Sequence, residues 1–307
     1  MNRHEFIDVS TISMSELLLR NSRFFSQSLS SAPIGDVIRG TAIDIEDFRT
    51  GGVQEISAST PIGEFQAAYL VSQWRGSDAP TLLYHHGSGE QPFDLGRFSS
   101  NSFHRIFGTN FDRNVNLIVL RAPFHDRSNR EYIRAMGDLE NFVGMLATSA
   151  ALMEALADQL RDTGCSAILA AGISLGGWAV NLHRAYYDGV DRYVPVFAGA
   201  QLGEMFVSSI YRKLVAESTR ANPEVLRTVL DFEDAFTSND ADNCDPLLAR
   251  YDRIIEFETQ RFAYEGSNIG ILEKVLRRIA RRGSISAFSL TPPPVENRYT
   301  AVGSTDI

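Results

Sequence analysis

The segment from residue 166 to residue 178 constrains the fold of this chain more than any other part of the sequence. The apolar run at residues 167–171 is too short for a helix and is typical of a strand buried on both faces. A glycine-flanked turn around Ser174 follows, and residues 178–187 have a helical pattern. The segment therefore predicts a strand, a sharp turn with a serine at its apex, and a helix.

The glycines around this serine have a steric reason. A side chain at Gly172 or Gly176, two residues before and after Ser174, would collide with the neighbouring strand and helix. The turn also strains the serine backbone, which only small neighbours permit. This arrangement is the one called a nucleophile elbow, and the free N–H groups of the following helix favour an anion that develops beside the serine.

Composition excludes several classes of protein. The 307 residues are 44% hydrophobic and 22% charged, which is typical of a soluble globular protein, and suffice for one large α/β domain. A net charge of −9 argues against non-specific binding of nucleic acid. No apolar run approaches the ~20 residues that span a bilayer, so we expect no membrane span.

The N-terminal residues lack the pattern of a secretory signal, and the two cysteines, Cys165 and Cys244, are expected to be buried free thiols. Both observations favour a cytoplasmic protein. The sequence contains neither a Cys/His cluster with metal-ligand spacing nor a phosphate-binding glycine motif after a first strand. We therefore predict no metal and no cofactor, and expect a small-molecule substrate or ligand as a partner, and no nucleic acid.

Strand and helix patterns alternate along the rest of the chain, which predicts a mostly parallel sheet flanked by helices. A hairpin is expected at residues 53–74, and a helix at 138–163 precedes the elbow strand. The other expected strands cover residues 81–85, 115–120, 193–198, 245–250 and 268–273, with a short helix at 257–264. A helical insertion at about 203–241 is interpreted as a lid over the site.

We divide the chain into an N-terminal helical extension (1–34), a main domain (35–274) and a C-terminal tail (275–307). The extension is expected to form one amphipathic helix within residues 13–31. The tail is basic in an acidic protein and contains serines and a run of three prolines, a composition that suits a mobile segment. One hypothesis is that a change of reading frame near residue 274 replaced the original ending.

Two loops are expected at the carboxyl edge of the sheet, where open α/β sheets bind ligands. Residues 86–89 follow the strand at 81–85, and their glycines let backbone N–H groups point above the sheet. Residues 121–127 follow the next strand, so that His125 and its neighbours either face a substrate or lie in solvent.

Four landmarks appear in the order found in one family: His86-Gly87 after a strand, the elbow, a helical insertion, and Asp252 after the next-to-last strand. Over roughly residues 50–274 the chain resembles the α/β-hydrolase superfamily, serine hydrolase type. The resemblance implies that Ser174 is the nucleophile and Asp252 the acid that orients a histidine. It also implies an oxyanion hole built from the N–H of Leu175 and that of Ser88 or its neighbour Gly87.

The catalytic histidine of that family should follow the last strand, but no histidine occurs after His183. A serine hydroxyl without a general base loses about 10²–10⁴ in rate. His125 is the only substitute base that the predicted loops offer. The prediction is therefore an esterase-like serine hydrolase lineage acting on an ester or amide through Ser174, with impaired activity. The alternative is a pseudoenzyme: a non-catalytic α/β-hydrolase-fold protein that binds a small molecule.

Overall fold

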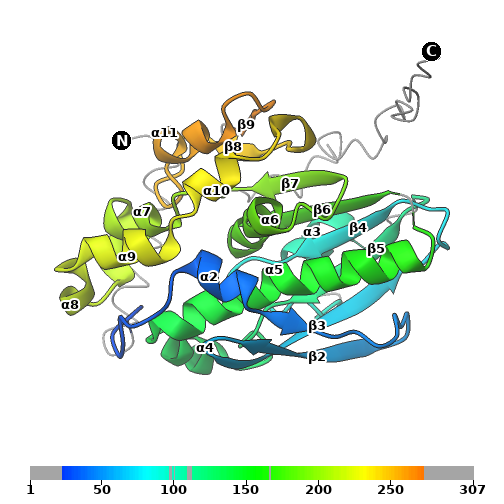
Figure 1. The fold of residues 1–307 in the computed structure, drawn as a ribbon, viewed down its shortest axis with the longest axis horizontal. Helices are drawn as coiled ribbons and strands as arrows, with labels where there is room; N and C mark the ends of the chain where they lie inside the picture. Colours follow the sequence, from blue (N-terminus) through cyan, green and yellow to red (C-terminus); the bar gives the residue numbers. More distant parts are fainter. Residues whose placement is uncertain (1–22, 97–98, 100, 109–112, 166, 273–307) are drawn as a thin grey trace, which may run out of the picture.

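The computed structural model describes residues 23–96, 99, 101–108, 113–165 and 167–272. Within these residues the strands form one nine-stranded sheet in the order β1-β2-β3-β5-β4-β6-β7-β8-β9 (Figure 1). The pairs from β1 to β5 are antiparallel, and all pairs from β5 through β9 are parallel. The mostly parallel sheet that the sequence predicted is confirmed. The strands are β1 (Ala42–Ile43), β2 (Val53–Thr60), β3 (Gly63–Gln73), β4 (Thr81–His85), β5 (Asn116–Arg121), β6 (Ile168–Ile173), β7 (Arg192–Val196), β8 (Leu247–Ala249) and β9 (Gly270–Leu272).

The central parallel strands are apolar because both of their faces are covered. Every residue of β4 and of β6 is buried, which matches the continuous apolar runs that predicted them. β2 and β3 form the expected hairpin, and β2 alternates between its two faces in burial. This hairpin adds an antiparallel edge to the sheet.

The longest helix that the structure describes is α5 (Leu139–Asp162), 24 residues long. It packs against α6 (Leu175–Tyr186), α2 (Ile34–Arg39) and β3. Gly144 lets α5 approach the sheet, because a Cβ there would lie 2.0 Å from the Phe65 ring of β3. Elsewhere, α3 (Ser102–Phe107) packs two aromatic rings on Tyr84 of β4, and α4 (Asn129–Ala135) precedes α5.

The insertion between β7 and β8 is helical, as predicted, but it is broken into short pieces. These are α7 (Leu202–Val207), η1 (Ile210–Leu214), α8 (Glu217–Arg220), α9 (Pro223–Leu230), α10 (Glu233–Thr237) and η2 (Ala241–Asn243). After β8, the expected helix at 257–264 consists of α11 (Phe257–Gln260) and the 3-10 turn η3 (Arg261–Tyr264). In Figure 1 the insertion lies at one end of the molecule, next to the carboxyl end of β7.

The N-terminal segment differs from the expected helix. Residues 1–22 lie outside the described part, and residues 23–31 form no helix. Instead Phe24 exchanges backbone hydrogen bonds with the insertion, donating to Leu214 O and accepting from Ala216 N–H, both at 3.0 Å. Phe25 N–H donates to Met136 O at 3.0 Å. The segment thus joins the insertion to the start of α5, through long-range contacts that no local pattern shows.

Three further expectations concern the C-terminal tail, the cysteines and membrane-spanning helices. The proposed tail at 275–307 lies outside the described residues. Cys165 and Cys244 are buried free thiols, as predicted. Among the helices of the described ranges, none is long and apolar enough to cross a bilayer.

Candidate active site

Ser174 lies between β6 and α6 in a strained conformation, with φ of 52° and ψ of −111°. Its N–H donates to Val196 O at 2.8 Å, and its carbonyl accepts from Trp178 N–H at 3.0 Å. Ser174 is the residue before the first helical one, yet its side chain makes no capping hydrogen bond. The backbone is therefore fixed on both sides, while the hydroxyl has no structural task at the helix start.

The glycines of the elbow are required by close backbone contacts. A Cβ on Gly172 would lie 2.3 Å from Gly176 O, and a Cβ on Gly176 would lie 2.3 Å from His85 O. A Cβ on Gly177 would lie 2.8 Å from Val196 O. All three contacts are with backbone atoms, which cannot move aside cheaply. The predicted steric reason for these glycines is confirmed.

Residues 86–89 lie beside the elbow. A Cβ on Gly87 would be 3.6 Å from Cγ2 of Ile173, the residue before Ser174. The N–H of Gly89 donates to the ring of His125. By contrast, the backbone N–H groups of Leu175, Gly87 and Ser88 have no acceptor among the described residues. The amides expected to hold an oxyanion are thus not bonded to any described acceptor.

Asp252 follows β8 in a turn that fixes its carboxylate. Its Oδ1 accepts from the N–H groups of Ile254 and Ile255 at 2.8 and 3.0 Å, and the residue is 9% exposed. β6, β7 and β8 are parallel neighbours, so Ser174 and Asp252 both follow the carboxyl end of a strand. The sheet brings the expected nucleophile and acid to one edge, with β7 between them.

Comparison with known proteins gives structural matches only. No family model matches the sequence, and no curated protein matches it. An acylaminoacyl peptidase from Pyrococcus horikoshii aligns with a TM-score of 0.50 and 16% identity, over 77% of this chain and 39% of the peptidase. The chain therefore spans well under half of that protein. Acetyl xylan esterase 1 from Thermoanaerobacterium sp. covers 84% of this chain and 92% of its own, with a TM-score of 0.49 and 11% identity.

The peptidase match, the strand order and the serine elbow all indicate the same fold. The chain has the α/β-hydrolase fold. At these identities the likeness concerns the fold, and the activities in the names of the matched proteins belong to those proteins.

In this α/β-hydrolase fold, three histidines form a buried cluster at the carboxyl ends of β4 and β5. The ring centroids of His85 and His86 are 4.8 Å apart, and those of His86 and His125 are 4.5 Å apart. Burial lowers the pKa of all three, to about 4 for His85 and His125. The cluster is therefore neutral at pH 7.

Both ring nitrogens of His125 form hydrogen bonds with backbone groups of the two loops, residues 86–89 and 121–127. Its Nε2 accepts from Gly89 N–H at 3.1 Å, which places the ring proton on Nδ1, and Nδ1 donates to Pro123 O at 3.0 Å. To accept a proton from Ser174, the Nε2 of His125 would first have to release Gly89 N–H. The structure thus places His125 beside the predicted oxyanion loop, with the loop amide on its basic nitrogen.

His86 is used in the same way, since its Nε2 accepts from Ala122 N–H at 3.1 Å and its Nδ1 donates to Gly87 O at 2.7 Å. His85 donates from Nδ1 to His86 O, and its Nε2 is buried without a partner among the described residues. Both His85 and His86 therefore bond to nearby backbone groups.

The remaining histidines lie elsewhere. His183 is buried far along α6, between the carboxylate of Glu154 at 2.8 Å and the hydroxyl of Tyr193 at 3.0 Å. His104 is on α3, and His4 lies outside the described residues. The sequence analysis offered only His125 as a substitute base.

Tyr132 is a neighbour of the site that the sequence analysis missed. Its hydroxyl is 2.7 Å from Ser88 Oγ, and its ring centroid is 4.5 Å from that of His125. It is carried by α4, which begins with a capping box in which Ser128 and Glu131 bond to each other's backbone N–H. The S-x-x-E spacing at residues 128–131 was the signal that could have predicted this helix.

No group of three or more His, Cys, Asp or Glu side chains in the described ranges could hold a metal ion. The three clustered histidines do not form such a site, because backbone groups occupy five of their six ring nitrogens.

Proposed function

We propose that Ser174 is the nucleophile of an acyl-transfer site of the serine hydrolase type, acting on an ester or an amide, and that its reaction is slow. Ser174 Oγ would attack the acyl carbonyl carbon. The N–H groups of Leu175 and Ser88, or of Gly87 beside it, would hold the developing oxyanion. Asp252 would be the acid.

The observation that carries this proposal is the elbow itself. A serine held at φ of 52°, with a hydroxyl that caps nothing, has a strained backbone and an unused nucleophile. The unused amides beside it have the chemistry of an oxyanion hole. Backbone strain and unpaired N–H donors destabilise a fold, and proteins retain them mainly at functional sites.

We expect the reaction at Ser174 to be slow because no free general base is evident among the described residues. The sequence has no histidine after His183, and His125 already accepts a backbone N–H on the nitrogen that a base would use. Its lowered pKa, about 4, also makes it a weak base at pH 7. We therefore assign His125 to holding the loop at Gly89 rather than to proton transfer.

The insertion at 202–243 is proposed to cover this site as a lid. It begins at the carboxyl end of β7, at the edge where Ser174 lies, and leads to the start of β8. Its contacts with Phe24 and Phe25 hold it against the start of α5, so we propose a fixed cover rather than one that swings open.

Labelling with a fluorophosphonate tests the proposal. We expect labelling that Ser174→Ala abolishes, at a rate about 10²–10⁴ below that of a serine hydrolase with a complete triad measured in parallel. Added imidazole should accelerate the wild-type protein, because it supplies the missing base. Labelling at the full rate, without an imidazole effect, would contradict the assigned impairment.

His125→Gln separates the two roles of that residue. If His125 holds the loop, imidazole accelerates the variant and the wild type by similar factors. If His125 were the base, the variant alone would respond to imidazole, and our assignment would be wrong.

The second candidate is a binding protein without turnover. The occupied Nε2 of His125 favours it, because no other base is evident at the described elbow. Hydrolysis of short p-nitrophenyl esters at equal rates by the wild type and by Ser174→Ala, together with no Ser174-dependent labelling, would support this candidate over the first.

A further inference from the structure

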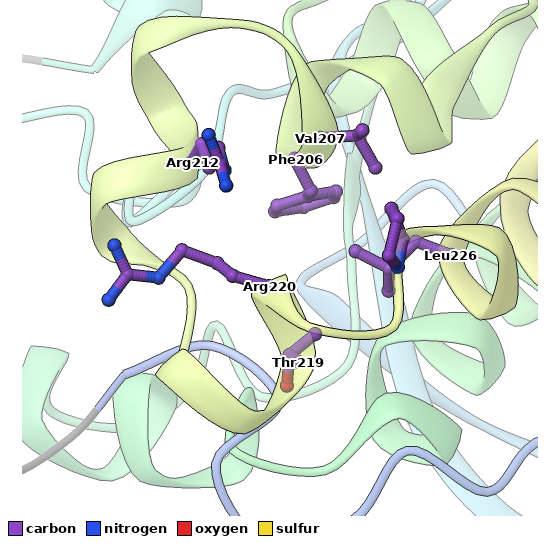
Figure 2. Close-up of a pocket in the computed structure, with 7 residues that line it drawn as sticks. Phe206, Val207, Arg212, Thr219, Arg220 and Leu226 are labelled. Atoms are coloured by element: carbon purple, nitrogen blue, oxygen red, sulfur yellow. The ribbon is translucent and has the colours of Figure 1, made fainter.

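A small pocket lies inside the insertion, among α7, η1, α8 and α9. Figure 2 shows Arg212 and Arg220 on one side of it and Phe206 and Leu226 on the other. Val207, Thr219 and Pro223 complete the lining. One wall is thus cationic and the other apolar.

The two arginines have no counter-ion within the part of the chain that the structure describes. Neither Arg212 nor Arg220 forms an ion pair with a carboxylate of the described residues, whereas Arg227 nearby pairs with Glu204 and Glu224. Residues 212–220 contain three basic side chains and one acidic one, in a protein of net charge −9. A local positive potential is therefore expected at this pocket.

Arg220 carries the stronger signal, because its Nε is buried and has no acceptor within the described part of the chain. A buried N–H of a charged group without an acceptor destabilises the fold. An anion that binds the Arg220 guanidinium would supply an acceptor to this arginine.

The apolar wall is preorganised. The ring centroid of Phe206 is 4.9 Å from that of Phe25 and 5.4 Å from that of Phe142, in edge-to-face contact with both. The carbonyl of Leu226 would lie 2.8 Å from a Cβ on Gly203, so α7 and α9 are in close contact. A ligand would not have to order this wall, which lowers the entropic cost of binding.

The pocket has a volume of about 220 Å³. At roughly 30 Å³ per water-sized group, this accommodates about seven non-hydrogen atoms. A ligand with one anionic head for the arginines and a short hydrocarbon part for Phe206 and Leu226 fits both the size and the two walls. A guanidinium binds a carboxylate through two parallel hydrogen bonds.

We infer that this pocket is a binding site for a short-chain organic carboxylate, formed by Arg212 and Arg220 with Phe206 and Leu226. The site is independent of the proposed acyl-transfer reaction, since it involves neither Ser174 nor Asp252.

Isothermal titration calorimetry with pentanoate at constant ionic strength tests this inference. We expect saturable millimolar binding that is at least about tenfold tighter than that of 1-pentanol, which lacks the charge, or of inorganic phosphate, which lacks the hydrocarbon part. Ser174→Ala should bind pentanoate as the wild type does. Equal affinities for pentanoate and phosphate would show a plain anion site and overturn the assignment.

Substitution of each arginine locates the site. Arg220→Met should weaken pentanoate binding by at least about tenfold and leave 1-pentanol unchanged, because an ion-paired hydrogen bond is worth about 1.5–3 kcal/mol. Arg212→Met, at an exposed residue, should act in the same direction without risk to the fold. Lys213→Met is the matched control, since it removes a neighbouring cation that does not line the pocket. Equal losses in all three variants, or no saturable binding by the wild type, would refute the inference.

Discussion

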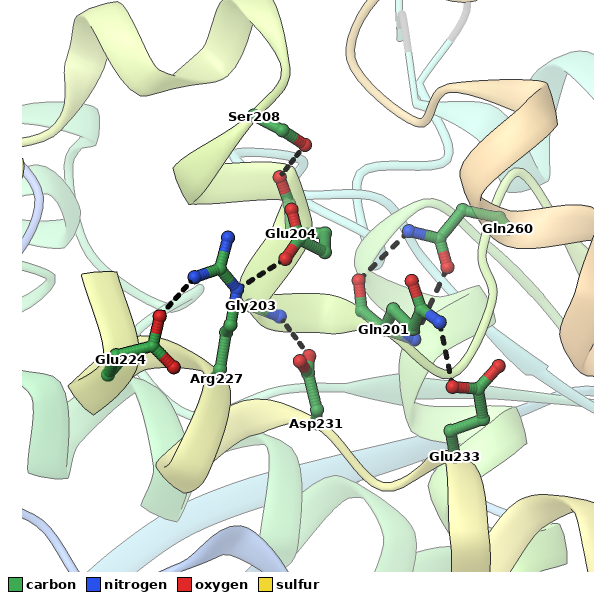
Figure 3. Close-up of polar contacts among 9 residues, drawn as sticks. All are labelled: Gln201, Gly203, Glu204, Ser208, Glu224, Arg227, Asp231, Glu233 and Gln260. Atoms are coloured by element: carbon green, nitrogen blue, oxygen red, sulfur yellow. Dashed lines mark hydrogen bonds and ion pairs between the residues drawn. The ribbon is translucent and has the colours of Figure 1, made fainter.

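Asp231 is predicted to make the protein less stable at alkaline pH. It follows the last residue of α9 and accepts a hydrogen bond from Gly203 N–H at 2.6 Å (Figure 3). Burial raises the pKa of this carboxyl to about 7, the bond from Gly203 lowers it, and the charge of Glu204 adds to the rise. Arg227 counteracts this only in part, because it is itself paired with Glu204.

The direction of this pH dependence follows from the linkage between proton binding and folding. The pKa of Asp231 is higher in the folded than in the unfolded chain, so the folded state binds the proton more tightly. The resulting stability is complete below pH 3.8, the ordinary value, and is lost as the pH rises through about 7. At about 1.4 kcal/mol per pKa unit the full difference is about 4 kcal/mol, and contact with solvent reduces it to about 2 kcal/mol.

Asp231→Asn removes the ionisation and keeps an oxygen for Gly203 N–H. We expect the variant to be about 2 kcal/mol more stable than the wild type at pH 8.5, with about a quarter of that gain left at pH 4.5. Urea unfolding at both values measures the difference. Asp78→Asn, at an exposed carboxyl in the turn before β4, is the control and should show no such dependence. A gain that is equal at both pH values, or a loss at pH 8.5, would refute the reasoning.

Two further predictions concern the elbow, and both are read from thermal or urea unfolding. Gly176→Ala places a Cβ 2.3 Å from the backbone of His85 and should lower the free energy of unfolding by about 3 kcal/mol or more. The control Gly51→Ala has open space around it and should change stability by less than about 0.5 kcal/mol. Similar small effects for both variants would contradict the packing argument. Ser174→Gly should be about 1 kcal/mol more stable than Ser174→Ala, since only glycine relaxes a φ of 52°, and the opposite order would mean that the serine backbone is not strained.

The sequence predicted best those elements whose pattern lies within a few consecutive residues. The buried strands β4 and β6 are short apolar runs, and the strained turn between β6 and α6 is visible in its glycines. Boundaries shifted by a few residues: α6 begins at Leu175 instead of 178, because the helix starts directly after the serine. The predicted helix at 13–31 failed in its described part, since Phe24 pairs with the insertion, 190 residues away.

The positions of the candidate site residues in the fold were predictable from the sequence, but their hydrogen bonds were not. Ser174, Leu175, Ser88 and Asp252 follow from their place after strands, and the structure positions them at one edge of the sheet. The state of His125 did not follow, because it depends on a loop glycine, 36 residues earlier, donating to its ring. Hydrogen bonds between two loops have no periodic trace in sequence.

The presence of the elbow is not by itself evidence of catalysis. Gly176 packs on the carbonyl of His85 at the end of β4, and Gly177 on that of Val196 at the end of β7, so both glycines join neighbouring strands whatever the chemistry. A chain that had lost catalysis would still need them. The hydroxyl of Ser174 is different, because it caps no helix, while its backbone carries a strain that glycine would relieve. A serine at this position is thus explained by a reaction more readily than by folding, and labelling at Ser174, rather than the intact shape of the turn, is the measurement that decides between the two functions.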